Sequence, residues 1–364
     1  MNKKIIVTAM GLVLAGGMGL ANADVKLYGQ LDVSVNATDS DTNNVPNNYT
    51  DDINMDSTNS AVGVKGSEDL GNGMSAFFKV EYETDIVNGG GGTGRDMFVG
   101  VKFDGFGKLT FGTASTAYKS PGAAIDAFYR TPLQSRAVGL QSNLHSGKGE
   151  EGQGRGTNMI RYDSPSFSGV SLTATYQLDS DKQTQTLPPG VSCGDVASCE
   201  DEDPYSLGIQ YKGGNLFAAA SYISTQRDDD AEAYQILAKY SMADFTVHGI
   251  YEGDMGLITA QANNGINSPQ GRNASAMDDG ANYWSVGGTY TIGNNLLALD
   301  YGQRDESDGV DGVSNNADDI EESTSWRLAG YHKFSERTRV YAGYANTDYD
   351  DKGEDEIFSL GMRH

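Results

Sequence analysis

Histidine and carboxylate side chains could give this chain acid–base chemistry, but few of them are arranged to do so. Only four histidines occur, and His145 shares a long stretch without strand pattern with Asp126. A histidine–aspartate pair becomes catalytic only beside a positioned nucleophile or a second acid. No HExxH, G-x-S-x-G or Walker motif accompanies the pair, and no GxGxxG stands in a strand–helix setting. The sequence therefore predicts no enzyme and no bound cofactor or metal.

The two cysteines, Cys193 and Cys199, could bind a metal or bond to each other. They lie in LPPGVSCGDVASCEDEDP with no histidine nearby, and two thiols alone make a poor metal site. In an oxidising compartment, a disulfide between them would close a small loop. The spacing favours this disulfide over the metal pair.

The beginning of the chain indicates such a compartment. Lys3 and Lys4 precede a mostly apolar run over residues 5–20, which ends at the small residues Ala21-Asn22-Ala23. This order is typical of a secretory signal peptide. We expect residues 1–23 to be the signal peptide and the mature domain to span residues 24–364.

Charge and hydropathy exclude two classes of protein. The net charge is −24, and removal of two lysines and no acid with the signal peptide takes it to −26. Such a chain repels phosphates, which argues against a nucleic-acid partner. The mean hydropathy of −0.47 is too polar for a helical membrane protein. It suits a barrel in which only alternate residues of short strands are apolar.

The stretch GVSLTATYQL at 169–178 shows the period-two pattern of a strand with one apolar and one polar face. In a soluble sandwich the apolar face would point into a protein core. In an outer-membrane barrel it would point into lipid, with the polar face toward water.

Sixteen segments of this kind recur, with short and long connections alternating between them. A closed barrel with short periplasmic turns and long outer loops predicts this alternation, whereas a sandwich does not. The fold class expected is therefore all-β, one antiparallel sixteen-stranded transmembrane barrel. Its strands are predicted at residues 25–37, 58–66, 74–86, 95–103, 108–114, 156–163, 169–178, 205–212, 215–226, 232–241, 244–253, 282–292, 295–304, 323–334, 337–349 and 355–364.

Five stretches, in order along the chain, resemble the Gram-negative general diffusion porins, above all those of Neisseria and related bacteria. They are DVKLYGQLDVSV at 24–35, NSAVGVKGSEDLGNGMSAFFKVEYE at 59–83, RDMFVGVKFDGFGKLTFG at 95–112, RGTNMIRYDSPSFSGV at 155–170 and YHKFSERTRVYAGY at 331–344. The resemblance implies a homotrimer in the outer membrane, in contact with lipid and lipopolysaccharide. It also implies passive passage of small hydrophilic solutes and ions through a water-filled pore, which the third outer loop, here residues 115–154, narrows.

In the family, basic residues on the barrel wall oppose that loop. Arg155 matches this pattern, whereas Gln30, Ala61 and Thr113 stand where related porins often carry a basic residue. The thinned ladder predicts weak cation preference or near neutrality, because fixed charge at a constriction sets ion preference. The candidate pore-lining residues are Lys65, Lys79, Lys102, Asp126, Arg130, Arg136, Arg155 and Arg161. For Lys65, Lys79, Lys102 and Arg161, which face inward by strand parity, the alternative is that they are ordinary solvated charges in the lumen.

Two other functions stay open at this point. Phe128, Tyr129 and Arg130 could form a binding track in a substrate-specific outer-membrane channel. An acidic secreted adhesin or sandwich protein is the third reading, and it would need no detergent to stay in solution.

Overall fold

A computed structural model describes residues 24–41, 52–138, 140–145, 148, 154–178, 203–224, 232–255, 282–306, 322–350 and 353–364. The predicted signal peptide 1–23 lies outside the described residues, and so does the predicted disulfide between Cys193 and Cys199. No helix in the described ranges is long and apolar enough to cross a membrane.

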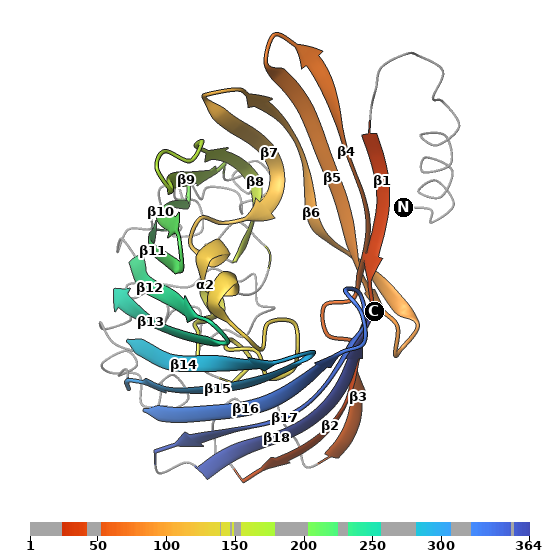
Figure 1. The fold of residues 1–364 in the computed structure, drawn as a ribbon, viewed down its shortest axis with the longest axis vertical. Helices are drawn as coiled ribbons and strands as arrows, with labels where there is room; N and C mark the ends of the chain where they lie inside the picture. The colour runs from red at the N-terminus through yellow and green to blue at the C-terminus, as the bar shows by residue number, and fades with distance from the viewer. Residues whose placement is uncertain are drawn as a thin grey trace, which may run out of the picture.

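The described chain is almost entirely β structure, arranged in one antiparallel sheet with eighteen strands (Figure 1). One α-helix, α2 (Lys119–Ile125), and one short 3-10 helix, η1 (Asn143–His145), interrupt it. The strands are β1 (Asp24–Gln30), β2 (Asp32–Ser40), β3 (Asp52–Asp56), β4 (Ala61–Gly71), β5 (Met74–Asp85), β6 (Gly90–Phe103), β7 (Gly107–Ser115), β8 (Arg155–Asp163), β9 (Val170–Gln177), β10 (Tyr205–Gly213), β11 (Leu216–Ser224), β12 (Glu232–Met242), β13 (Phe245–Met255), β14 (Tyr283–Ile292), β15 (Asn295–Arg304), β16 (Ser323–Lys333), β17 (Arg339–Tyr349) and β18 (Gly353–Arg363).

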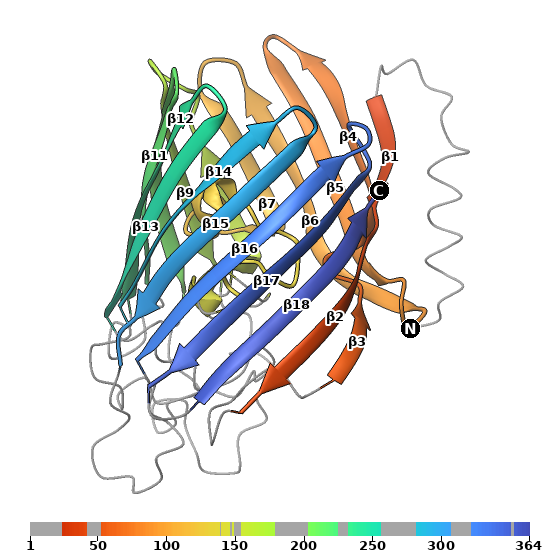
Figure 2. The ribbon, with the colours of Figure 1, turned by 60° about the horizontal axis from the view of Figure 1, so that its bottom comes forward.

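Consecutive strands from β4 to β18 pair as neighbours, so the sheet follows the order of the chain. The first strands join both of its ends, because β18 pairs with β2, β2 with β3, and β1 with β4. Figure 2 shows the tilt of the strands across the sheet. Closing a sheet on itself requires such a tilt.

The structure has two strands more than the sixteen that the sequence predicts. The predicted strand 25–37 is divided at Leu31, whose N–H and carbonyl bond to the backbone of His364 at 2.8 and 2.9 Å. A second extra strand, β3, lies in a stretch that the sequence assigned to an outer connection. The pattern of side chains could not reveal either difference, because both arise from backbone pairing with distant parts of the chain.

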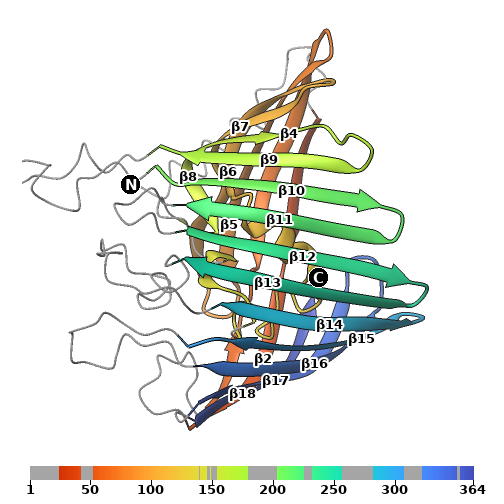
Figure 3. The same cartoon turned by 90° about the vertical axis from the view of Figure 1, so that its left-hand side faces the viewer.

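Tight turns join β10 to β11, β12 to β13 and β14 to β15 at the same end of the sheet (Figure 3). Their first residues, Gly214, Ala243 and Gly293, have φ of 54°, 49° and 57°. Two-residue hairpins favour this left-handed region because it matches the twist of the strands. Glycine adopts it without strain at two of the three positions.

The two faces of the strands are the reverse of those in a soluble protein. Apolar side chains such as Leu172, Leu207 and Leu299 are about half exposed, at 51 %, 51 % and 55 %. Polar side chains on the opposite face, such as Ser206 and Gln235, are 1 % and 0 % exposed. The sheet therefore turns its apolar face outward, as a barrel in lipid requires.

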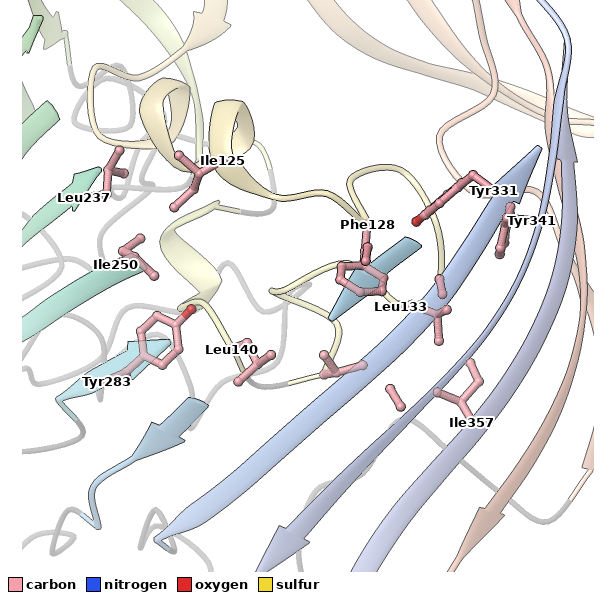
Figure 4. Packing of buried hydrophobic residues seen from close by; sticks show 14 of the residues in the cluster. Ile125, Phe128, Leu133, Leu140, Leu237, Ile250, Tyr283, Tyr331, Tyr341 and Ile357 are labelled. Atoms are coloured by element: carbon pink, nitrogen blue, oxygen red, sulfur yellow. The ribbon is translucent and has the colours of Figure 1, made fainter. Parts of the chain in front are cut away.

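A long segment between β7 and β8 covers part of the concave face of the sheet, and Figure 1 shows α2 inside the curve. We call its described residues from Thr116 to His145 the inner segment. Its apolar side chains pack against side chains of the sheet in the cluster shown in Figure 4. That cluster includes Ile125, Phe128, Leu133, Val138 and Leu140 of the segment, with Leu237, Ile250, Tyr283, Tyr331, Tyr341 and Ile357 of the strands.

Candidate functional site

A fully buried carboxylate, Glu252 on β13, holds both ends of the inner segment. It accepts a hydrogen bond from the Ser142 backbone N–H at 2.8 Å and from the Tyr118 hydroxyl at 3.2 Å. His145 Nε2 lies 2.5 Å from its Oε1. Charge-assisted hydrogen bonds of this kind are stronger than neutral ones. One side chain of the sheet thus fixes the residue before α2 and the turn around η1.

Arg327 on β16 holds the middle of the inner segment. Its side chain is 1 % exposed, and its guanidinium donates to the Leu133 carbonyl at 2.7 Å and to Ser135 Oγ at 2.5 Å. The same group lies 3.0 Å from Asp126 Oδ1 and 4.1 Å from the centre of the Phe128 ring. A buried guanidinium needs acceptors and counter-charge, and the inner segment provides both.

Asp300 on β15 is a second carboxylate partner of Arg327, and it comes from the sheet rather than from the inner segment. It is buried, accepts a hydrogen bond from Arg327 at 2.9 Å and lies 2.6 Å from His248 Nε2 on β13. A Cβ at Gly287, its partner on β14, would collide with the Asp300 carboxylate. The glycine therefore leaves the space in which this carboxylate reaches Arg327 and His248.

A second group of charged side chains alternates in sign across β5, β6 and β8. We call Lys79, Glu81, Arg95, Asp96 and Arg155 the charged row. Lys79 Nζ lies 2.6 Å from Asp96 and 3.0 Å from Glu81, and Arg95 Nε lies 2.9 Å from Glu81. Arg155 Nε lies 2.7 Å from Asp96. Each carboxylate therefore bridges two cations and neutralises part of a basic wall.

The structure places the other predicted strand residues apart from one another. Lys65 Nζ lies 5.1 Å from the centre of the Tyr28 ring, a cation–π distance. Lys102 is exposed near Asp104 at 3.5 Å. Arg161 pairs with Asp163 at 2.6 Å and donates to the Ser115 carbonyl at 2.5 Å. Of the predicted strand residues, only Lys79 and Arg155 share a carboxylate.

The predicted loop residues have different surroundings. Asp126 is buried against Arg327 rather than beside His145, so these two residues, paired in the sequence reading, have different partners. Arg130 has φ of 66°, and its guanidinium lies 5.8 Å from the Tyr129 ring. Arg136 donates to the His145 carbonyl at 2.8 Å and also lies over the Tyr129 ring.

Sequence reasoning missed the residues that fix the inner segment, namely Glu252, Asp300 and Arg327. A signal for them existed. Each is a charged residue at a polar-face position within an alternating strand, as in LLALDYG, where small or uncharged residues would suffice. A charged residue at such a position predicts a partner of opposite charge, because a charge that is buried without one is costly.

Three comparisons relate the chain to known proteins. A family model described as "Gram-negative porin" matches residues 8–352. The major outer membrane protein P.IB of Neisseria sicca is 28 % identical over 380 residues, covering 98 % of each chain. An outer membrane porin protein of Bordetella pertussis is 27 % identical over 241 residues, covering 61 % of this chain and 59 % of that protein.

Solved structures share the fold at lower sequence identity. The anion-selective porin from Comamonas acidovorans has a TM-score of 0.68 and 19 % identity, covering 94 % of this chain and 99 % of that one. OmpT of Vibrio cholerae in its trimer form has a TM-score of 0.62 and 18 % identity, with the same coverage. At such identities the likeness concerns the fold alone.

Proposed function

The chain belongs to the Gram-negative porin family, and from this premise we propose how its parts form and narrow a pore. It is an outer-membrane general diffusion porin, a channel for passive transport of small hydrophilic solutes and ions. The observation that carries this function is the sheet's inverted polarity, with an exposed apolar face and a polar face on the concave side.

The pore wall is a closed barrel of sixteen strands. Only Leu31 separates β1 from β2, which supports treating them as one bent strand. The pairings β1–β4 and β2–β3 support the same treatment of β3 and β4. The bent first strand then pairs with the second strand on one side and with β18 on the other. These pairings leave that barrel without a free edge, which a sheet in lipid requires.

The inner segment, within the predicted third outer loop 115–154, is the constriction. Its anchors at Glu252 and Arg327 support this role, because both hold it to the concave face of the sheet. The charged row faces it from β5, β6 and β8. Of the residues expected from the sequence, those proposed to line the pore are Lys65, Lys79, Lys102, Arg130, Arg136, Arg155 and Arg161. The eighth, Asp126, is buried against Arg327 and holds the inner segment instead.

The working assembly is a homotrimer in contact with outer-membrane lipid and lipopolysaccharide. The trimer form of the Vibrio OmpT structure supports the oligomer. Residues 215–223, NLFAAASYI, are apolar on both faces and suit a subunit contact. Export through the signal peptide 1–23 would yield the domain 24–364, with a loop disulfide between Cys193 and Cys199.

Planar-bilayer recording of refolded residues 24–364 tests this function. We expect large, ohmic, stepwise openings, grouped in threes if the trimer is the conducting unit. Heat-modifiable migration on a gel establishes that the sample is folded. A folded sample without conductance would overturn the diffusion function, and saturable flux of one solute would favour a substrate-specific channel instead.

Replacement of Asp96 by asparagine is expected to shift the channel toward anions. The change removes the carboxylate that Lys79 and Arg155 share, which leaves two less compensated cations. A unit charge contributes about 1 kcal/mol at 4 Å in water, so the chloride-to-potassium permeability ratio should rise by up to about fivefold. The reversal potential in a salt gradient measures it. Asp104→Asn, at an exposed turn, is the matched control, and an equal shift in both variants would refute this role.

A further inference from the structure

Two aromatic side chains, Phe77 on β5 and Phe98 on β6, lie on the concave face of the sheet, where strand alternation favours polar residues. Phe98 lies directly opposite Lys79 of the charged row, and directly opposed residues share one face. Phe77 precedes Lys79 by two residues in the same strand and therefore shares that face as well. The two rings are half-buried, with their centres 6.1 Å apart and an interplanar angle of 76°. This is the edge-to-face arrangement that aromatic pairs prefer.

The inner segment does not cover this aromatic pair. The apolar cluster beneath that segment contains neither ring, and α2 contacts β12 and β13 instead. A Cβ at Gly100, the partner of Phe77 on β6, would come within 2.3 Å of the ring Cζ. The glycine therefore lets Phe77 lie against the backbone of β6. Burial of apolar surface is favourable, so the two rings can contribute affinity to a solute that covers them.

A recess of about 320 Å³ lies at these rings, and three lysines, Lys26, Lys65 and Lys79, also line it. Its volume falls in the range of small-molecule sites. Two of the three ammonium groups already have carboxylate partners, since Lys26 Nζ lies 2.7 Å from Asp24 and Lys79 Nζ lies 2.6 Å from Asp96. In the part of the chain that the structure describes, Lys65 forms no ion pair. The recess thus combines an aromatic wall with one cation that lacks a carboxylate partner there.

This combination favours a solute that carries both an aromatic ring and a single negative charge. Aromatic rings attract one another in edge-to-face or offset arrangements, and an ammonium group attracts a carboxylate. We propose that the recess binds an aromatic monocarboxylate, with its ring against Phe77 and Phe98 and its carboxylate toward Lys65. The site rests on the proposed porin function, because the pore supplies the solute. It involves no residue of the inner segment, so the site and the constriction can be altered separately.

Benzoate is the probe, because it combines one ring with one carboxylate. Single-channel recording of the refolded mature chain in potassium chloride, with benzoate titrated in at neutral pH, should show a saturating decrease of the current. Acetate, which lacks the ring, should need at least about tenfold higher concentration for the same decrease, and benzylammonium, which reverses the charge, should cause none. Phe98→Leu should raise the apparent dissociation constant for benzoate about fivefold, and Lys65→Gln about threefold.

Phe106→Leu and Lys333→Gln are the matched controls, because Phe106 is exposed in the turn after β6 and Lys333 is exposed at the end of β16. Their benzoate titrations should equal that of the parent, and heat-modifiable migration establishes that each variant is folded. A current that benzoate does not decrease, an equal decrease by acetate, or a block unchanged in Phe98→Leu would overturn the aromatic site and leave the diffusion function intact. Loss of all conductance in the folded parent chain would instead contradict the porin function itself.

Discussion

Replacement of Arg327 by methionine is expected to lower the free energy of unfolding by about 3–5 kcal/mol, the usual effect of breaking a buried ion pair from one side. The change leaves Asp126 and Asp300 buried without their shared cation. It also removes the donors to Leu133 and Ser135. The middle of the inner segment should then leave the sheet, and the single-channel conductance should rise.

Urea unfolding from lipid vesicles and single-channel recording measure the two effects separately. Arg337→Met is the control, because Arg337 is exposed in the turn between β16 and β17. Adding Asp300→Asn to Arg327→Met should recover part of the loss, since one unpaired carboxylate disappears. An unfolding midpoint equal to that of the control would show that Arg327 does not anchor the segment.

Replacement of Glu252 by alanine is the second change with a large expected effect, about 3 kcal/mol. It leaves the Ser142 N–H and the buried His145 ring without their carboxylate partner. Tyr118 loses the same acceptor. Because these residues flank the inner segment, the proposed constriction, at both ends, we expect faster fluctuation of the open-channel current rather than a larger steady conductance.

Hydrogen exchange around Ser142 provides a second measurement for this variant. The amide bonds to Glu252 in the parent, so its exchange should accelerate in Glu252→Ala. Glu336→Ala, at an exposed turn position, should leave both exchange and current noise unchanged. Equal protection of Ser142 in the parent and in Glu252→Ala would be incompatible with this anchor.

The strands could be predicted from the sequence because their signal is local. Alternation with period two needs only neighbouring residues, and all sixteen predicted segments overlap a strand of the structure. The predicted alternation of short and long connections likewise needs only the turn residues between segments. The family resemblance added the pore and its narrowing loop, which alternation alone does not supply.

The partners of charged residues could not be predicted in this way. Asp126 and Arg136 are only about ten residues apart in the chain, yet Asp126 forms an ion pair with Arg327, whereas Arg136 donates a hydrogen bond to the His145 carbonyl. No pattern in the loop distinguishes them. Their difference depends on which strand residues lie opposite once the segment folds back.

The sequence by itself therefore determined the strands, their two faces and the class of protein, since side-chain period and turn residues act over a few neighbours. Only the tertiary structure decided where the first strand breaks at Leu31 and which carboxylates hold the inner segment. These features depend on electrostatic and hydrogen-bond distances of a few ångströms between residues far apart in the chain. Such distances exist only after the sheet curves and the segment packs against it.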